Sequence, residues 1–318
     1  MRLSVPDRVA LANQRDLTAE KTRAIARDPS PVVRRALCKL GPKLPEDVIL
    51  RLAGDKSVDV RAAIIENHAL YSAALPDAAI RRLSLDPNDG VRAALAASPA
   101  IPGDVRRGLA RDAVTEVRVR AIVCLPRDER HDELLREAAN DSETRVRLVV
   151  ALKNQTPNDL IERLANDAEP EVRRAISLHP DLSAELAEKL AVDPDTLVRS
   201  ALVSRRDSSE SLLLGLALDP FEDVRFSVAM RPPSLQPESV LDALVADSSL
   251  DVRRTLADHF DLPARIALSL SDDRSSKIAM RARKRREAFS AHELLEAETI
   301  NAERGVGKRR RTPRNEKR

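Results

Sequence analysis

Apolar residues recur along the chain at the three- and four-residue spacing of amphipathic helices, in short stretches separated by polar turns. One unit of this pattern is illustrative. Thr156 is predicted to cap a first helix, in which Leu160 and Leu164 lie on one apolar face. A second helix is predicted from about Pro170 to shortly before Pro180, because a residue ahead of proline resists the helical conformation. No segment alternates as a strand would, so the pattern predicts pairs of short helices.

The second helix of each unit carries a recurring signature, which is an aspartate, four variable residues and then Val-Arg. Small and larger apolar residues follow the valine three and four positions later, as Ala175 and Ile176 follow Val172. These positions share one helix face, which we expect to be buried. Successive aspartates lie 26 to 31 residues apart, a near-constant period that is typical of a stacked repeat array. The signature occurs at Asp28 and Arg34, Asp55 and Arg61, Asp86 and Arg92, Asp112 and Arg118, Asp141 and Arg147, Asp167 and Arg173, Asp193 and Arg199, Asp219 and Arg225, and Asp247 and Arg253.

Some units depart from the signature. In the fourth, Arg120-Ala121 replaces the apolar pair, which predicts a local shift of one residue. Two intervals are long and contain residues 68–76, with Tyr71, and residues 127–132. Insertions in repeat arrays map to loops on one face, where they either touch partners or reflect neutral drift.

The aspartate and arginine of one signature lie six residues apart and cannot face each other along one helix, since the aspartate falls in the preceding turn. We expect each aspartate to cap or brace the start of the second helix. Each arginine would then reach an aspartate or a turn carbonyl, in its own or the adjacent unit, through charge-assisted hydrogen bonds. A structural ladder is favoured over a ligand-binding stripe of nine arginines, because as many aspartates repeat in the same register.

The unit Leu-Ala-x-Asp-Pro-x-x-x-Val-Arg is clearest at residues 190–199 and 216–225. It resembles the repeat of the leucine-rich repeat variant family and is more broadly similar to HEAT-like repeats, over roughly residues 8–279. The resemblance implies an all-α fold, a right-handed α-solenoid (superhelix) of about ten short two-helix repeats. We therefore expect a HEAT-like or leucine-rich-repeat-variant solenoid over residues 1–279, a basic helix over 280–303 and a disordered basic tail over 304–318.

Composition narrows the chemistry that the chain can perform. Some proteins of the variant family carry an N-terminal cysteine cluster for an iron–sulfur centre, but this chain has only Cys38 and Cys124, so no cofactor is expected. HEAT-like DNA glycosylases use aromatic side chains around a catalytic aspartate, which a chain with 2% aromatic residues and no Trp supports poorly. There is no secretory signal and no apolar run of about 18 residues, which predicts a cytoplasmic protein without membrane contact.

No set of catalytic side chains emerges from the sequence. His179 and His259 occupy the same position in their repeats, but three repeats separate them. Packed helices lie about 8–10 Å apart, which places the two imidazoles roughly 30 Å from each other. Residues 305–308 resemble the end of a phosphate-binding loop, but Arg309 replaces the required Ser or Thr and no strand precedes them. We expect no catalytic, cofactor-binding or metal site, no small-molecule substrate and no enzymatic activity.

A solenoid offers an extended surface lined by one helix of each pair. The residue after each repeat arginine should be less buried than its neighbours, and Phe226 is the candidate anchor for a partner there. The alternative, which we favour, is that Phe226 packs over a neighbouring repeat. The residues at this position are Arg35, Ala62, Ala93, Val119, Leu148, Arg174, Ser200, Phe226 and Arg254.

The C-terminal part of the sequence is strongly basic. Residues 274–318 carry 15 Lys and Arg against 6 Glu, whereas the rest of the chain carries 39 basic against 45 acidic residues. Such blocks attract phosphate backbones through counterion release; a solubilising tail or a contact with the acidic body are the alternatives. The leading hypothesis is a non-enzymatic repeat scaffold that mediates protein–protein interaction through its extended solenoid surface. The alternative is a nucleic-acid-associated protein with contacts at Arg281, Arg283, Lys284, Arg285, Arg286, Lys308, Arg309, Arg310 and Arg311.

Overall fold

The computed structural model of the chain describes residues 3–14, 16–70, 74–125 and 131–304. Within these ranges every regular element is a helix and there is no strand, so the predicted all-α class is confirmed. The chain divides into two compact units, Met1–Leu160 (unit 1) and Ile161–Arg318 (unit 2). Helix α12 (Asn158–Leu164) spans the boundary between them. None of the described helices combines the length and apolar character that a membrane span requires.

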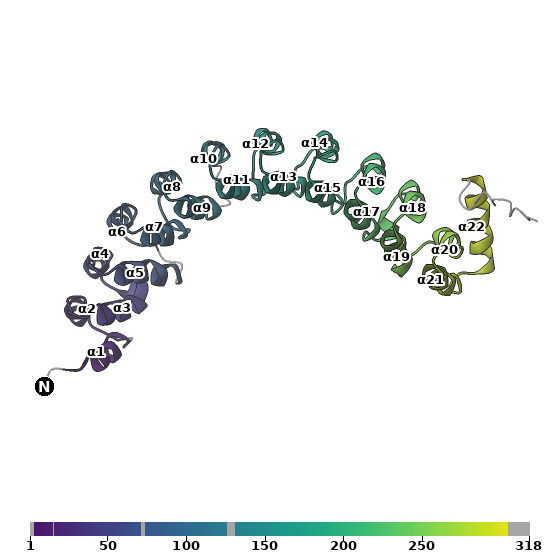
Figure 1. Ribbon diagram of the computed structural model, residues 1–318. Coiled ribbons are helices and arrows are strands. Elements are labelled where there is room, and N and C mark those ends of the chain that lie inside the picture. Colours follow the sequence, from purple (N-terminus) through teal and green to yellow (C-terminus); the bar gives the residue numbers. More distant parts are fainter. Residues whose placement is uncertain (1–2, 15, 71–73, 126–130, 305–318) are drawn as a thin grey trace, which may run out of the picture. The chain divides into compact units, whose positions relative to one another are not determined.

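Short helices in unit 1 form two rows, and the second helices of neighbouring repeats pack directly on one another (Figure 1). The first helices are α2 (Ala19–Ile25), α4 (Glu46–Ala53), α6 (Asp77–Leu83), α8 (Gly103–Leu109) and α10 (Asp132–Ala138). The second helices are α1 (Val5–Ala12), α3 (Pro31–Leu37), α5 (Val58–Leu70), α7 (Asp89–Ala96), α9 (Thr115–Val123) and α11 (Thr144–Ala151). A 3₁₀ helix, η1 (Cys38–Lys43), follows α3.

Unit 2 repeats the same arrangement of two rows (Figure 1). Its first helices are α14 (Ala184–Leu190), α16 (Glu210–Ala217), α18 (Glu238–Val245) and α20 (Ala264–Leu270). Its second helices are α13 (Pro170–Ser177), α15 (Thr196–Leu202), α17 (Glu222–Ala229), α19 (Leu250–Asp258) and α21 (Ser276–Arg286). A 3₁₀ turn, η2 (Pro233–Leu235), precedes α18, and α22 (Ala291–Glu303) packs on α20.

Hydroxyl side chains begin several of the first helices. The oxygens of Thr18 and Ser183 accept hydrogen bonds from the backbone N–H three residues later, at 3.3 and 3.2 Å. Each bond satisfies an amide that the helix itself cannot pair. Thr156, the predicted cap of α12, behaves differently: its hydroxyl donates to the carbonyl oxygens of Val150 and Lys153, at 2.6 and 2.8 Å. That residue therefore also braces the end of the preceding helix, and its predicted role as the cap of α12 stays a prediction.

The predicted apolar positions of the second helices form the core. In all nine repeats the signature valine and the residue four positions after it are completely buried. Burial of one such aliphatic side chain contributes about 1.5–3 kcal/mol, so the array gains most of its stability from these layers. The pairs are Val33 and Leu37, Val60 and Ile64, Val91 and Leu95, Val117 and Ala121, Val146 and Val150, Val172 and Ile176, Val198 and Leu202, Val224 and Val228, and Val252 and Leu256.

The one-residue shift predicted for the fourth repeat is wrong. Arg118 keeps the register of the signature and donates to Asp141 at 2.7 Å. Ala121 occupies the buried position that a larger residue fills in the other repeats. Arg120 instead lies on the surface and donates to Glu116, one helical turn earlier, at 2.8 Å. The repeat tolerates the polar residue because its long side chain reaches solvent without any change in helix register.

The long intervals are only partly described. Helix α5 continues to Leu70, so residues 68–70 extend a helix where a loop was expected, and Tyr71 lies outside the described residues. Most of the second insertion, residues 126–130, also lies outside them.

The expected single basic helix over residues 280–303 is two helices. Helix α21 ends at Arg286, and α22 begins after Ser290, whose hydroxyl accepts from the backbone N–H of Glu293 at 3.3 Å. This capping box explains why a new helix starts there. Residues 305–318 of the expected disordered tail lie outside the described residues. The right-handed sense of the superhelix and the number of repeats stay predictions.

Candidate functional site

One repeat arginine shows how the signature residues meet. Arg34 on α3 donates from Nε and Nη2 to the two carboxylate oxygens of Asp55, at 2.6 and 2.8 Å. Its Nη1 donates at 2.6 Å to the carbonyl oxygen of Asp28, in the turn before its own helix. Asp55 Oδ1 also accepts from the backbone N–H of Ser57 at 2.8 Å, which braces the start of α5. The arginine therefore ties its own turn to the turn of the next repeat.

The same geometry recurs along both units, with Nε–Oδ2 distances of 2.5–2.8 Å. Arg8 and Asp273, which the signature did not include, extend the series. Arg8 precedes Asp28 by 20 residues and Arg253 precedes Asp273 by 20, a spacing that occurs in several other pairs and could have revealed both. We call this series the ladder: Arg8–Asp28, Arg34–Asp55, Arg61–Asp86, Arg92–Asp112 and Arg118–Asp141 in unit 1, and Arg173–Asp193, Arg199–Asp219, Arg225–Asp247 and Arg253–Asp273 in unit 2.

Two signature residues fall next to the boundary between the units. Arg147, in unit 1, donates to the carbonyl oxygens of Asp141 and Ser142, at 3.0 and 3.1 Å. Asp167, in unit 2, accepts from the backbone N–H of Glu169 at 3.0 Å. Each residue therefore makes the turn contacts that are typical of its position.

The ladder partners stabilise each other's charged forms. Hydrogen bonds from Arg92 hold the pKa of Asp112 below its ordinary range, and they outweigh burial, which acts in the opposite direction. The carboxylate of Asp55 in turn raises the pKa of Arg34. These are bidentate, charge-assisted pairs, and their geometry leaves the guanidinium groups directed at the turns.

One of the most buried pairs is also covered by a neighbouring side chain. Arg199 and Asp219 expose only 7% and 5% of their side chains. The guanidinium of Arg199 lies over the ring of Phe221, at 5.3 Å from its centroid. Sequence reasoning had selected Phe226 and missed this ring, although Phe221 follows a signature aspartate by two residues and so lies in the turn that the ladder contacts.

The face of the second helices opposite the core is exposed to solvent in most repeats. It consists of the residue before each signature valine and of the residues two and six positions after it, which lie within about 60° of one another around the helix. We call it the solvent face. In unit 2 it carries Leu178, Leu197, Phe226 and Met230, which are 48%, 60%, 36% and 57% exposed. Phe226 therefore keeps about a third of its surface accessible to a partner.

The expected exposure of the position after each arginine holds for most repeats but not all. Arg35, Arg174, Phe226 and Arg254 are exposed, and Ala62, Leu148 and Ser200 are half-buried. Ala93 and Val119 are buried, which contradicts the expectation for these two repeats. Both side chains are small enough to be covered by the adjacent second helices.

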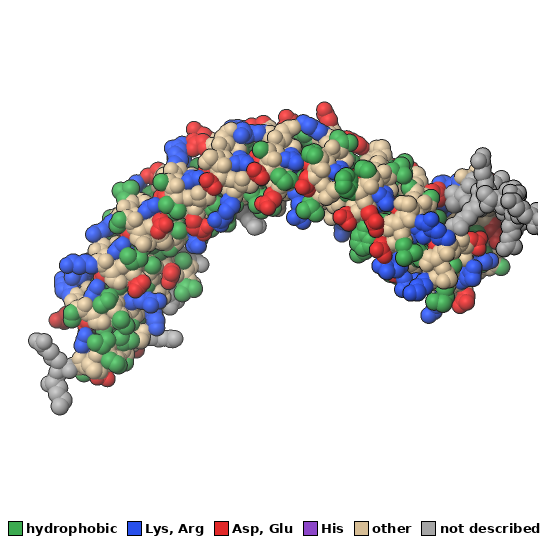
Figure 2. Space-filling model, in the orientation of Figure 1, with side chains coloured by type: hydrophobic (Ala, Val, Ile, Leu, Met, Phe, Trp, Pro, Cys, Tyr) green, Lys and Arg blue, Asp and Glu red, His purple; other side chains and the backbone are tan. Residues whose placement is uncertain are grey.

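The basic residues at the end of α21 make several contacts within the protein. Arg281 donates to Asp258 Oδ2 at 3.2 Å, and Arg285 donates to the carbonyl oxygen of the same residue at 3.3 Å. Arg283 donates to the carbonyl oxygen of Ser271 at 3.1 Å. On the visible face of each unit, basic and acidic side chains are interspersed (Figure 2). Lys284 and Arg286 are at least partly exposed, whereas Lys308, Arg309, Arg310 and Arg311 lie outside the described residues.

His179 and His259 have separate surroundings. Nδ1 of His179 accepts from the backbone N–H of Asp181 at 3.1 Å. Nε2 of His259 lies 2.8 Å from the carbonyl oxygen of Ala229. These residues follow α13 and α19, and α15 and α17 are stacked between those helices. The two imidazoles therefore belong to different sites, each at a helix exit.

His68 is a buried histidine whose protonation should destabilise the fold. It is 1% exposed, its Nδ1 bonds to the carbonyl oxygen of Ile64 at 2.9 Å, and burial lowers its pKa below the ordinary value of 6.5. Because the neutral ring is favoured in the folded state, the stabilisation is complete above pH 6.5 and is lost as the pH falls towards the lowered pKa. We expect the urea midpoint of the protein to fall between pH 7 and pH 5, and His68→Leu to reduce that fall.

The matched variant for this measurement is His292→Leu, which changes an exposed ring on α22. It should keep the pH dependence of the wild-type protein. An unchanged slope in the His68→Leu variant would contradict the assignment.

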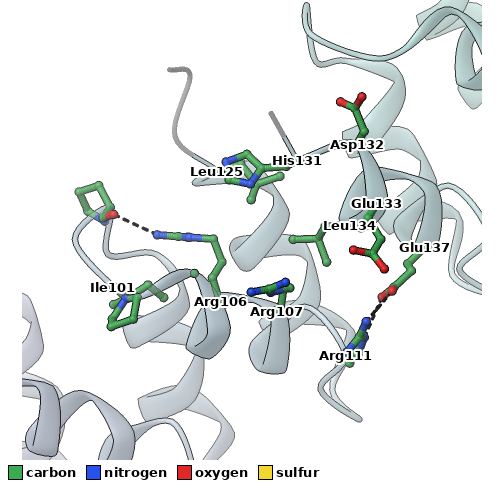
Figure 3. Close-up of a pocket in the computed structure, with 13 residues that line it drawn as sticks. Ile101, Arg106, Arg107, Arg111, Leu125, His131, Asp132, Glu133, Leu134 and Glu137 are labelled. Atoms are coloured by element: carbon green, nitrogen blue, oxygen red, sulfur yellow. Dashed lines mark hydrogen bonds and ion pairs between the residues drawn. The ribbon is translucent and has the colours of Figure 1, made fainter. Parts of the chain in front are cut away.

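A cavity of about 510 Å³ lies between the repeats that contain α8 and α10 (Figure 3). Arg111 and Glu137 form an ion pair at its rim, and Arg106 donates to the carbonyl oxygens of Ser98 and Pro99 at 2.8 and 3.1 Å. The Arg106 guanidinium is thus used to hold a turn, and its side chain is buried. Asp132 points away from Arg106 in Figure 3. Arg106, Arg111 and Glu137 of the lining therefore hold adjacent segments of the repeats together.

No group of three or more His, Cys, Asp or Glu side chains among the described residues is arranged to hold a metal ion. The thiol of Cys38 is buried, and burial raises its pKa to about 12. A thiol in this state is a poor nucleophile and a poor ligand at neutral pH.

Comparisons with known proteins identify the fold. No protein-family model and no curated protein matches the chain. A solved leucine-rich repeat variant, described as having a novel repetitive structural motif, is 22% identical with a TM-score of 0.57, over 73% of this chain and 88% of that one.

Two further solved structures align over more of the chain with lower similarity. A chain of the Pds5–Scc1 complex is 13% identical with a TM-score of 0.31, over 87% of this chain and 64% of that one. A computationally designed armadillo repeat protein for modular peptide recognition is 18% identical with a TM-score of 0.13, over 90% and 100%. These two TM-scores are too low to indicate a common fold, whereas the leucine-rich repeat variant shares its fold with this chain. The chain has the helical-repeat solenoid fold of the leucine-rich repeat variant.

Proposed function

We propose that the chain is a non-enzymatic repeat scaffold that binds a protein partner on the solvent face of its second helices. The observation that carries this proposal is the set of large apolar side chains on the solvent face of three successive second helices, namely Leu178 on the exit of α13, Leu197 on α15, and Phe226 and Met230 on and after α17. Exposed apolar residues that lie together are typical of protein-binding surfaces. An aromatic ring such as Phe226 is a common anchor of a protein–protein interface.

The ladder supports this assignment because it leaves the solvent face free for binding. Its arginines and aspartates contact turns between the helices, and the core residues occupy the opposite side of each second helix. In unit 2 the exposed apolar residues of the solvent face are thus part of neither the core nor the ladder. The comparisons give no support to the alternative, a nucleic-acid-associated protein.

Replacing two anchors tests the proposal. In the full chain, Phe226→Ala with Met230→Ala should reduce recovery of a co-purifying partner at least ten-fold, because both side chains contribute apolar contact at one site. Both are partly or largely exposed, so the thermal midpoint should change little. The measurement is affinity purification from the native cell, quantified by mass spectrometry, with and without nuclease.

The control variant is Phe260→Ala, which removes an 85% exposed ring at the exit of α19. It should retain the partner at the wild-type level. Equal recovery with the double variant and with wild type would overturn the proposal, and so would a loss of the partner on nuclease treatment alone.

A further inference from the structure

The first helices of unit 2 carry a row of carboxylates on their outer side. We call the acidic row Glu185 and Glu188 of α14, Glu210 of α16, and Glu238 and Asp242 of α18. The four glutamates are exposed and Asp242 is half-buried. The same three helices contain one basic residue, Lys189, which donates to Asn166 and so turns towards the preceding repeat.

Several carboxylates on the first helices of unit 1 are paired with an arginine of the adjacent repeat. The pairs are Arg23–Asp47, Arg81–Asp104, Arg111–Glu137 and Arg136–Asp159. In unit 2, Asp242 pairs with Arg265 of the adjacent repeat in the same way, whereas Glu188 and Glu210 have serine partners. Glu188 accepts from Ser209 and Ser211 at 3.0 and 3.1 Å, and Glu210 accepts from Ser239 at 2.5 Å. Among the described residues no cationic side chain pairs with Glu188 or Glu210, so this part of the row carries uncompensated negative charge.

The C-terminal helix places Arg304 at one end of the acidic row. Helix α22 packs on α20, and the buried Asn301 donates to the carbonyl oxygen of Arg265 and to Ser269 Oγ, both at 3.1 Å. These bonds hold the last turn of α22 in place. Arg304, the next residue after the helix, pairs with both Glu238 and Asp242. The chain thus leaves α22 on the acidic row, with one arginine already bound there.

The sequence that follows Arg304 matches the remainder of the row in charge and in length. Residues 308–311 are Lys-Arg-Arg-Arg, four to seven positions beyond Arg304. An extended chain advances about 3.3 Å per residue, so this segment can lie roughly 13–23 Å from Arg304. Helix α16 packs on α18, and packed helices are about 8–10 Å apart, so α16 lies roughly 10 Å from α18. The basic segment therefore reaches the uncompensated Glu210 of α16 and extends from there towards α14, the next first helix of the row.

We propose that the acidic row of α14, α16 and α18 is the docking surface for residues 308–311 of the same chain. The bound arginine at position 304 and the complementary charges select this occupant. The segment would lie along the first helices and leave the solvent face of the second helices open. The basic segment would then connect adjacent repeats through several weak, salt-sensitive ion pairs.

Protection of the segment from trypsin tests the proposal in the full chain. Cleavage after residues 308–311, followed by mass spectrometry, should be at least five-fold faster when Glu185, Glu188 and Glu210 are replaced by glutamine. The same acceleration should appear in wild type at 0.5 M NaCl, because surface ion pairs are screened by salt (about 1 M gives a Debye length near 3 Å). The matched control removes three charges from the other side of unit 2, by Glu169→Gln, Glu171→Gln and Asp223→Asn, and should be cleaved at the wild-type rate.

A binding measurement identifies the occupant independently. A fluorescent peptide with the sequence of residues 305–318 should bind the full chain with Lys308, Arg309, Arg310 and Arg311 changed to glutamine at least ten-fold more tightly than it binds wild type, whose row is already occupied. Equal peptide affinity for the two proteins would overturn the proposal. So would equal trypsin rates in the acidic-row variant and in wild type, or protection that appears only after a single-stranded RNA is added.

Discussion

Replacing Arg199 with methionine should destabilise the protein by about 3–5 kcal/mol, the cost of leaving a buried charge without its partner. The Asp219 carboxylate would keep the hydrogen bond from the Phe221 backbone but would lose both bonds from the guanidinium. The carbonyl oxygen of Asp193 would lose a donor as well. The measurement is urea unfolding followed by circular dichroism, in which the variant should have a clearly lower midpoint than wild type; the midpoint can be compared even where repeats unfold in stages.

A double-mutant cycle separates the interaction between Arg199 and Asp219 from the other effects of each substitution on stability. Asp219→Asn removes the charge but keeps an acceptor for the Phe221 N–H, so it should harm wild type and partly rescue Arg199→Met. The exposed pair supplies the control: Arg136→Ala breaks a bond to Asp159 between side chains that are about half exposed, and the midpoint should hardly move. Additive effects at Arg199 and Asp219 would show that the two residues do not act as a pair.

Acid should unfold the array through the same carboxylates. The pKa values of Asp55, Asp86, Asp112, Asp141 and Asp193 are lower than their ordinary value of 3.8, since bonds from arginine and backbone N–H outweigh burial, which acts in the opposite direction. A lowered folded-state pKa means that the stabilisation is complete above about pH 4 and is lost as the pH falls through the folded value. Because several repeats lose it together, we expect a steep loss of helical signal below pH 4.

Replacing Asp112 tests the contribution of one ladder pair to this acid sensitivity. Asp112→Asn should cost about 2 kcal/mol at pH 7, because Arg92 loses its anionic acceptor. The difference from wild type should shrink as the pH falls below 4, where the wild-type carboxyl also becomes neutral. Asp104→Asn, at an exposed pair, should show little difference at any pH. A constant cost of Asp112→Asn from pH 7 to pH 2.5 would contradict the assignment.

The spacing of the signature residues predicts some of the ladder contacts but not all of them. An aspartate six residues before an arginine indicates a turn followed by a helix, which is why the turn bracing was foreseeable. From the sequence alone, the hydrogen-bond acceptors of each guanidinium could lie in its own repeat or in the adjacent one. The structure uses both, with the carbonyl of Asp28 in the same repeat and the carboxylate of Asp55 in the next, for Arg34. That choice depends on the offset between packed helices, which only side-chain packing sets.

The exceptions have the same origin. Arg120 in the fourth repeat suggested a shift because a charged residue stood at a buried position, yet the helix kept its register and the side chain reached solvent. Val119 looked accessible from its position but is covered by neighbouring helices. Local periodicity reports which face of a helix is apolar, and it does not report how much of that face the adjacent repeat covers.

The sequence by itself determined the paired helices, the buried valines and all of the ladder residues except Arg8 and Asp273, because these follow from helical periodicity and from a signature that recurs in register. Tertiary structure decided which aspartate each arginine contacts, that Leu197, Phe226 and Met230 stay exposed on adjacent helices, and that Arg304 meets Glu238 and Asp242. These contacts join residues of different repeats. Their distances depend on how whole layers pack, which no stretch of local sequence encodes.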